Sequence, residues 1–281
     1  MKTIEDIKNA VLEDLSSRLI HSGVMFRIFG RVKSERSLEH KMLLKGDKYR
    51  NGAKIQDMIG LRIVLYYYDD VESVEMFLSA NNLVDRSVDI PDISNFRPQR
   101  LNLVKRLDDA LVDDFRSALP EAYAQYIDDT YEIQIRTVFS EGWHEVEHDM
   151  RYKCKDDWTG CDSYSRQLNG IIATLETAEW SMGAIFREMS DKNLLQHNYT
   201  AMLRNQLRIR FANDSFSPAV ADYLNAHEDV VAKIHQTDRV VLILTLLSQN
   251  SPMPLTYDNV VFLINRIDIG DEGLAALANR A

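Results

Sequence analysis

The chain has few of the features that mark secreted or membrane proteins. Its 281 residues include only two cysteines, Cys154 and Cys161, with no second pair that would complete a zinc knuckle. Both are expected to be free thiols in a reducing compartment, and nothing supports a disulfide between them. The opening Met-Lys-Thr-Ile-Glu-Asp-Ile-Lys lacks the apolar core of a signal peptide, and no apolar run reaches the length of a membrane span. These absences predict a cytoplasmic protein with no membrane partner.

Internal repeats and low-complexity tracts are also absent, and an apolar fraction of 45% predicts a globular protein with a real core. Alternating or β-branched patterns predict strands over residues 25–32, 58–68, 101–107 and 131–137. Helical periods predict helices over residues 4–20, 34–44, 71–81, 108–126, 139–152 and 163–189, with Thr3 and Ser34 at the starts of the first two. A mixed sheet flanked by helices, and therefore the α+β class, is expected.

The pattern changes after about residue 192. Short helical segments separated by Ser, Asn and Pro follow to the end of the chain. We therefore expect two domains, one over residues 1–192 and a small helical module over residues 193–281. Packing or oligomerisation is one interpretation of this module, and a regulatory element that senses a protein partner is the other.

Basic residues gather in one part of an acidic chain. The formal net charge is −10, yet residues 23–54 contain nine Lys or Arg against three acids. A local excess of positive charge of this size indicates an anion site, and the alternative is a solvated helix face. Two carboxylates, Asp57 and Glu132, accompany the cluster and are expected on neighbouring strands of the sheet. Cations that neutralise a triphosphate and carboxylates that hold Mg²⁺ are what transfer of a phosphate-bearing group requires.

Four motifs in this order resemble the RelA/SpoT-type alarmone synthetases over roughly residues 20 to 190, in particular the small single-domain members. The motifs are Arg31-x-Lys33-x-x-x-Ser37-x-x-x-Lys41, Asp57-x-x-Gly60-x-Arg62, Glu132-x-Gln134-Ile135-Arg136-Thr137 and Glu147-His148-x-x-x-Tyr152-Lys153. The resemblance implies a nucleotidyltransferase-like fold. It also implies an ATP-dependent pyrophosphokinase that moves the β,γ-pyrophosphate of ATP to the 3′-hydroxyl of GDP or GTP.

The resemblance also implies roles for individual residues. Asp57 and Glu132 would be catalytic and would hold Mg²⁺, while the general base is left open. The ATP-binding residues would be Arg31, Lys33, Ser37, Lys41, Arg50, Arg62, His148 and Lys153. Among these, Arg31 and Arg62 would sandwich the adenine ring, since a planar guanidinium stacks well on a base. The acceptor would be bound by Phe96, Arg100, Asn102, Gln134 and Arg136.

The acceptor loop departs from the family pattern. Where the family has Tyr-x-Ser-x-His, this chain reads Asn-Phe-Arg-Pro-Gln-Arg-Leu-Asn-Leu over residues 95–103, which alters the expected guanine platform. Phe96 would still offer an aromatic face for stacking. Three hypotheses therefore stand: transfer to a guanosine nucleotide, transfer to an adenosine nucleotide or the tRNA 3′ end, and a non-catalytic nucleotide-binding regulator. A tRNA acceptor would need a second basic surface, and residues 193–281 contain seven basic and nine acidic residues.

Overall fold

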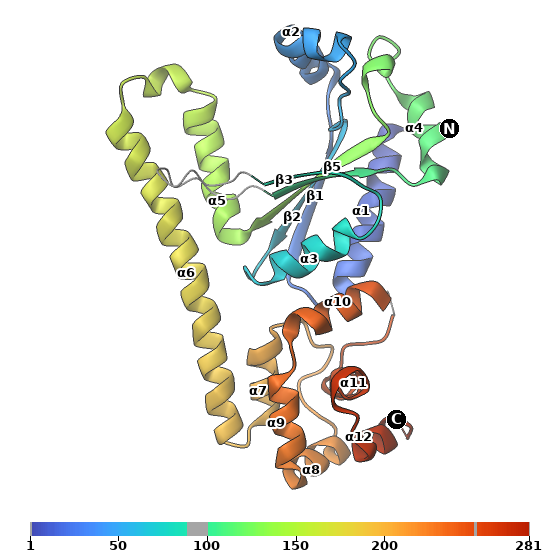
Figure 1. Ribbon diagram of the computed structural model, residues 1–281, viewed down its shortest axis with the longest axis vertical. Coiled ribbons are helices and arrows are strands. Elements are labelled where there is room, and N and C mark those ends of the chain that lie inside the picture. The colour runs from blue at the N-terminus through green and yellow to red at the C-terminus, as the bar shows by residue number, and fades with distance from the viewer. Residues whose placement is uncertain (1, 89–100, 250–251, 281) are drawn as a thin grey trace. The chain divides into compact units, whose positions relative to one another are not determined.

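The computed structural model describes residues 2–88, 101–249 and 252–280 (Figure 1). Within these residues a five-stranded sheet has the order β1-β2-β5-β4-β3. Its strands are β1 (Phe26–Val32), β2 (Ile59–Leu65), β3 (Leu83–Val88), β4 (Leu101–Arg106) and β5 (Thr130–Thr137). β2 and β5 run parallel and the other neighbouring pairs run antiparallel. The mixed sheet and its many helices confirm the predicted α+β class.

Two compact units divide the chain. The first consists of Met1–Ser16, Phe26–Tyr66 and Leu78–Glu176, and it contains the whole sheet. The second consists of Ser17–Met25, Tyr67–Phe77 and Thr177–Ala281. The expected domain boundary near residue 192 stays a prediction.

The helices up to residue 195 match the sequence patterns, with some changes of length. They are α1 (Ile4–His21), α2 (Glu35–Arg50), α3 (Asp70–Ser79), α4 (Asp109–Ala118), α5 (Val138–Glu147) and α6 (Asp162–Leu195). Short 3₁₀ turns η1 (Ala124–Tyr126) and η3 (Lys155–Trp158) and the π-helix η2 (His148–Tyr152) complete this part. Thr3 and Ser34 start α1 and α2 as predicted, since the Oγ1 of Thr3 accepts from the backbone N of Asp6 and the Oγ of Ser34 accepts from that of Ser37.

The sheet owes its two faces to alternation along β2 and β5. In β2 the side chains of Ile59, Leu61 and Ile63 are no more than 1% exposed, and Ile133 of β5 is fully buried. Successive side chains of a strand point to opposite faces, so the residues between these positions form a second, polar face. Thr137 ends β5 and caps α5: its Oγ1 accepts from the backbone N of Ser140, whose Oγ accepts in return.

Two predictions about this part were wrong. The helix expected over residues 108–126 ends at Ala118, because Leu119 precedes Pro120 and takes an extended conformation with ψ of 144°. β3 was not predicted, because its side chains are almost all exposed and therefore carry no alternation of apolar and polar residues. α2 also runs six residues further than expected, through a kink at Lys45.

The second unit is built mainly from helices. They are α7 (Tyr199–Leu207), α8 (Pro218–Ala226), α9 (Glu228–Gln236), α10 (Arg239–Gln249), α11 (Tyr257–Ile264), the π-helix η4 (Asn265–Ile269) and α12 (Glu272–Ala278). The same unit holds a buried ionic cluster in which Arg208 pairs with Asp69, and Arg239 pairs with the fully buried Asp70 at 2.5 Å. None of the helices described combines the length and the apolar character needed to cross a membrane.

Candidate functional site

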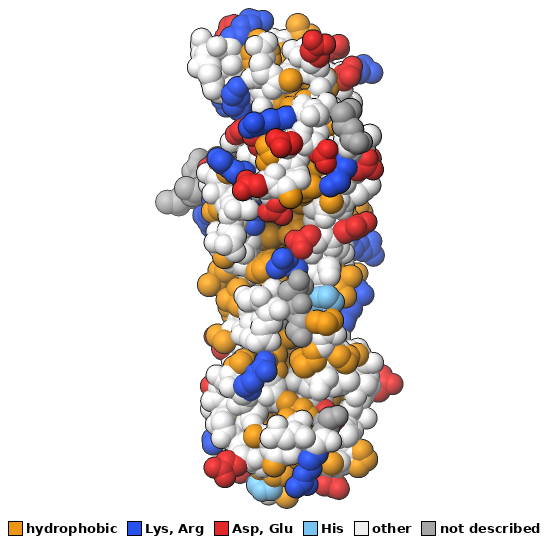
Figure 2. Space-filling view, turned by 90° about the vertical axis from the view of Figure 1, so that its right-hand side faces the viewer, with side chains coloured by type: hydrophobic (Ala, Val, Ile, Leu, Met, Phe, Trp, Pro, Cys, Tyr) orange, Lys and Arg blue, Asp and Glu red, His pale blue; other side chains and the backbone are white. Residues whose placement is uncertain are grey.

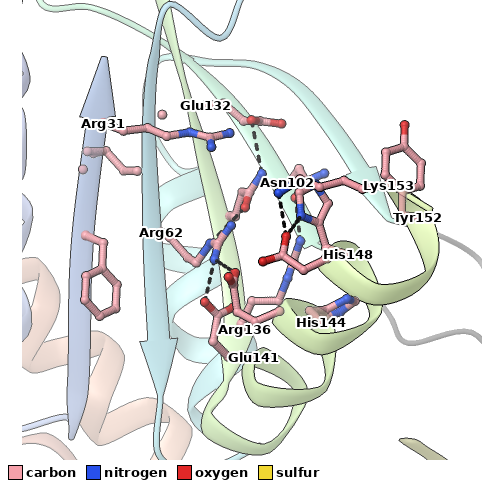
Figure 3. Close-up of a pocket in the computed structure, with 17 residues that line it drawn as sticks. Arg31, Arg62, Asn102, Glu132, Arg136, Glu141, His144, His148, Tyr152 and Lys153 are labelled. Atoms are coloured by element: carbon pink, nitrogen blue, oxygen red, sulfur yellow. Dashed lines mark hydrogen bonds and ion pairs between the residues drawn. The ribbon is translucent and has the colours of Figure 1, made fainter. Parts of the chain in front are cut away.

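The polar face of the sheet forms one wall of a cavity of about 650 Å³ in the first unit. The opposite wall comes from α5 and η2, which follow β5 directly in the chain. Predicted site residues that line this cavity are Arg31, Arg62, Asn102, Glu132, Gln134, Arg136, His148 and Lys153. Figure 3 shows the polar ends of those that it labels pointing into a common space from β1, β2, β4, β5 and the region of η2.

Strand register explains why Arg31 and Glu132 meet. Arg31 of β1 pairs with Gly60 of β2, and Gly60 pairs with Glu132 of β5. The side chain of Arg31 lies over Gly60, since a Cβ at residue 60 would be 3.7 Å, an ordinary contact distance, from the Cγ and Nε of Arg31. Figure 3 shows the Arg31 guanidinium reaching toward the Glu132 carboxylate. One rung of the sheet thus brings a cation and a carboxylate to the same side of the cavity.

The next rung places Arg62 in a fixed position. Arg62 pairs with Gln134 in the strand register, and its Nε donates to the Gln134 Oε1 at 3.2 Å. Its Nη1 donates to the Oε1 of Glu141 at 2.6 Å and also to Glu145, both from α5. Burial opposes the charge on this guanidinium, but the two carboxylates outweigh that effect and raise the pKa of Arg62.

Gln134 connects Arg62 to Glu132. Because a guanidinium only donates, the Gln134 oxygen faces Arg62 and its amide nitrogen is left to face Glu132. That nitrogen donates to the Glu132 Oε2 at 3.4 Å. The two rungs therefore form one chain of hydrogen bonds from α5, through Arg62 and Gln134, to the carboxylate of Glu132.

The wall formed by α5 and η2 presents a second set of charges. Asp149 accepts from Lys153 Nζ at 2.6 Å, and its Oδ1 lies 3.0 Å from His148 Nδ1. The hydrogen bond from Lys153, and then that from His148, hold the pKa of Asp149 below its usual value. Tyr152 stacks on the His148 ring with centroids 5.6 Å apart. The π-helical turn brings together these residues, which are five positions apart or less, and such turns are frequent at functional sites.

Asp57 lies with two lysines and is not among the residues that line the cavity. It precedes β2 by two residues rather than lying on a strand, which corrects the expected position. Its Oδ1 accepts from Lys41 Nζ at 2.7 Å, and its Oδ2 is 2.9 Å from Lys33 Nζ. Burial opposes ionisation of Asp57, but the ammonium groups of Lys41 and Lys33 outweigh it and lower its pKa.

The remaining predicted residues lie elsewhere or outside the described part of the chain. Ser37 is exposed in the first turn of α2, with its Oγ 2.9 Å from that of Ser34. Arg50 pairs with Asp47 and lines a second cavity of about 620 Å³ formed mainly by α2. Phe96 and Arg100 fall in residues 89–100, which are not described. Arg136 is buried and donates through Nη2 to the Oδ1 of Asn102 at 3.4 Å.

Only two of the candidate residues are carboxylates suited to Mg²⁺. Across the described ranges, no group of three or more His, Cys, Asp or Glu side chains is placed to hold a metal ion. Asp57 and Glu132 would therefore act as two separate hard-oxygen donors. This fits Mg²⁺, which often takes one or two carboxylates and completes its shell with waters and substrate phosphates.

Residues 30–157 match a family model described as "Region found in RelA / SpoT proteins". The chain carries a RelA/SpoT domain. This confirms the resemblance inferred from the four motifs. Every residue predicted for the site lies within the matched range. No curated protein sequence matches the chain.

Solved structures with similarity to the chain include a GTP pyrophosphokinase family protein from Streptococcus pneumoniae, at 21% identity and a TM-score of 0.46. The alignment covers 63% of this chain and 86% of that one. Small alarmone synthetases 1 and 2 from Bacillus subtilis are each 22% identical, with TM-scores of 0.45 and 0.46. These alignments cover 64% and 65% of this chain and 92% and 95% of those proteins. Similarity at this level does not carry over the roles of individual residues.

Several residues that line the cavity were not among the predicted site residues. They are Phe29, Gly30, Gly60, Leu61, Glu141, His144, Glu145, Asp149 and Tyr152. Phe29 lies two residues before Arg31 on β1, so strand alternation would have indicated it. Glu141 and Glu145 precede His148 at helical spacing, which by itself indicates that they share one face with His148 and Tyr152. Their pairing with Arg62 depends on how α5 lies beside β2, which spacing alone does not predict.

Proposed function

We propose that the RelA/SpoT domain transfers the β,γ-pyrophosphate of ATP to the 3′-hydroxyl of GDP or GTP. The observation that carries this proposal is the cavity that the guanidiniums of Arg31 and Arg62 and the ammonium of Lys153 line together with the carboxylate of Glu132. The cations would bind an anionic nucleotide, and Glu132 would supply a carboxylate at the reacting end. The family model that matches residues 30–157 supports the same reaction class.

The proposed roles follow the placement of each residue. Arg31 and Arg62 would bind the adenine ring, because the two arginines lie on adjacent strands. Three acceptors hold the edge of the Arg62 guanidinium, and its planar face would stack on the base. The phosphates would be held by Lys33, Ser37, Lys41, His148 and Lys153. Arg50, which lines the second cavity, stays a prediction.

Mg²⁺ would be held by Asp57 and Glu132, in agreement with the donor chemistry of these two carboxylates. When bound, the ion would neutralise charge on the transferred pyrophosphate. Glu132 lines the cavity from β5, and the amide of Gln134 donates to its carboxylate. An oriented carboxylate at this position would also accept the proton of the acceptor's 3′-hydroxyl.

The acceptor would lie against Asn102, Gln134 and Arg136, which line the same cavity. The altered loop that contains Phe96 and Arg100 keeps a second candidate in view, namely transfer to an adenosine nucleotide or to the 3′ end of tRNA. On the face drawn in Figure 2, acidic and basic side chains are interspersed among the residues shown in colour. A tRNA acceptor would need a second basic surface, and residues 193–281 contain seven basic and nine acidic residues, so the charge balance favours a mononucleotide acceptor.

Thin-layer chromatography with γ-labelled ATP and Mg²⁺ tests the proposal. The purified protein is offered GDP, GTP, ADP, AMP and deacylated tRNA in parallel. Label should move to GDP or GTP, and Glu132→Gln should abolish the transfer. Glu121→Gln, which removes the same charge from an exposed loop, should leave it unchanged. Label on tRNA or an adenosine nucleotide would favour the second candidate, and no transfer at all would favour a non-catalytic regulator. A homo-oligomer or a regulatory protein partner also remains a prediction.

A further inference from the structure

Both carboxylate oxygens of Asp57 are engaged by lysines of the same chain. Lys41 Nζ lies 2.7 Å from Oδ1 and Lys33 Nζ lies 2.9 Å from Oδ2. The side chains of Asp57 and Lys41 are each 26% exposed, and that of Lys33 is 16% exposed. These are partly buried ion pairs, which water and salt screen less than pairs on an open surface. Asp57 is therefore the internal counter-ion of two cations that the family pattern would assign to phosphate binding.

The charge balance at this point does not favour a metal ion by itself. One carboxylate and two ammonium groups sum to one positive charge, so a divalent cation that approaches Asp57 meets net repulsion. Mg²⁺ is a hard cation that bonds to carboxylate oxygens, and here both oxygens already accept from Lys33 and Lys41. The two lysines and a metal ion therefore compete for the same two atoms.

We propose that Lys33 and Lys41 keep Asp57 from binding a divalent cation until a polyphosphate draws both ammonium groups away. This inference rests on the proposed function, since it assumes a triphosphate as the anion. A triphosphate offers several negative oxygens where Asp57 offers one charge, and lysine side chains are long enough to change partner by rotation alone. The metal and the nucleotide then bind with positive coupling, and each strengthens the other by the same factor.

The local structure allows this exchange of partners without unfolding. The backbone N of Lys33 donates to the carbonyl of Met58 at 2.9 Å, which ties the end of β1 to the segment that leads into β2. Lys41 lies inside α2, whose first turn is capped by Ser34. The backbones of both lysines are thus held in place, so only their side chains need to move.

Metal binding in the absence of nucleotide gives the first test, measured with Mn²⁺ by electron paramagnetic resonance. The wild-type protein should bind weakly, and Lys33→Met/Lys41→Met should bind at least about tenfold more tightly, within the usual range of coupling between sites. Adding Asp57→Asn to that variant should remove the gain. Lys45→Met/Lys48→Met is the matched control, because it removes two charges from α2 at residues that line the second cavity. Equal affinity of the wild type and the Lys33→Met/Lys41→Met variant would overturn the proposal.

Nucleotide binding in the absence of metal gives the second test, with the α,β-methylene analogue of ATP in excess EDTA. If Asp57 competes for the lysines, Asp57→Asn should bind the analogue about fivefold more tightly than the wild type. A residue that acts only as a metal ligand would show no gain here. Glu132→Gln removes the same charge without releasing a lysine, so its gain should be clearly smaller. An unchanged or weaker affinity of Asp57→Asn, or an equal gain in Glu132→Gln, would refute the proposal.

The two proposals fail in different ways. Pyrophosphate transfer without coupled binding would leave the proposed function standing and remove the competition at Asp57. Coupled binding without any transfer would leave the competition standing and point to a nucleotide-binding regulator.

Discussion

Replacing Gly273 with Ala should destabilise the protein, although the same change in most helices is stabilising. Gly273 is the second residue of α12 and lies two positions after Asp271, the residue that caps this helix. A Cβ there would come within 2.1 Å of the Tyr223 Oη and 2.5 Å of its Cε2 and Cζ. The Tyr223 ring cannot move freely, because its hydroxyl donates to Asp271 at 2.7 Å and its ring stacks on His227 at 3.9 Å.

The size of the effect follows from these contacts. Burial, and then the hydrogen bond to Asp271, raise the pKa of Tyr223 to about 12, so its hydroxyl stays protonated and keeps donating at neutral pH. Displacing the ring gives up a hydrogen bond to a charged group, which is worth about 1.5–3 kcal/mol. The better helix propensity of Ala returns at most about 1 kcal/mol. The free energy of unfolding should therefore fall by about 1–2 kcal/mol.

Urea denaturation followed by circular dichroism measures this change, with Gly170→Ala as the control. Gly170 lies in α6, and no atom lies within 4 Å of the position its Cβ would take. Gly170→Ala should raise the free energy of unfolding by about 0.5–1 kcal/mol. A double-mutant cycle with Tyr223→Leu should remove the cost of Ala at position 273. A Gly273→Ala protein as stable as Gly170→Ala would show that the ring moves aside at no cost and that the reasoning is wrong.

Three further predictions concern other parts of the molecule. Burial raises the pKa of Asp70 to about 6 despite the charge of Arg239, so the folded state keeps a proton that the unfolded chain loses above about pH 4. Asp70 should lower the free energy of unfolding by about 3 kcal/mol as pH rises from 4 to 6.5. Denaturation of Asp70→Asn across this range should lack that loss, and parallel pH profiles of the free energy of unfolding for the variant and the wild type would contradict the prediction. Thr137→Ala should cost about 1–2 kcal/mol because α5 loses its cap, whereas Thr137→Ser should retain most of the stability on thermal denaturation. Arg151→Met should cost about 3 kcal/mol, since it removes a partner at 3.2 Å from the buried Glu147, and a melting temperature equal to the wild type would count against it.

Strand alternation was the part of the site that sequence could predict. The polar residues of β5 alternate with Ile133 and Ile135, so Glu132 and Gln134 had to share a face whatever the rest of the fold was. The order of the strands was beyond such reasoning, because pairing depends on contacts between distant segments. β5 lies next to β2 and brings Glu132 opposite Gly60, and the side chain of Arg31 lies over Gly60 from the strand on the other side of β2.

Edges and breaks of the fold were predicted less well, each for a local reason. β3 lies at the edge of the sheet, where exposed side chains carry no pattern. The segment of residues 108–126 has apolar residues at helical spacing on both sides of Pro120. Periodicity alone does not show that the proline turns Leu119 away from the helical conformation and ends α4 at Ala118. The pairs of Arg208 and Arg239 with Asp69 and Asp70 were likewise not predicted, because they join distant segments of the chain: Arg208 and Asp69 are 139 positions apart.

The basic cluster shows most clearly what charge counting misses. Nine Lys or Arg against three acids in residues 23–54 suggested cations available for an anion. Asp57 lies just outside that window and pairs with Lys33, which follows β1, and with Lys41, which lies in α2. Part of the positive charge is therefore already neutralised, so polyphosphate affinity is set by a competition and not by the excess alone. A protein with this arrangement should bind inorganic triphosphate more tightly once Asp57 is replaced by Asn, and isothermal titration in EDTA would measure the difference. If the affinity fell instead, Asp57 would have to support the lysines rather than compete for them.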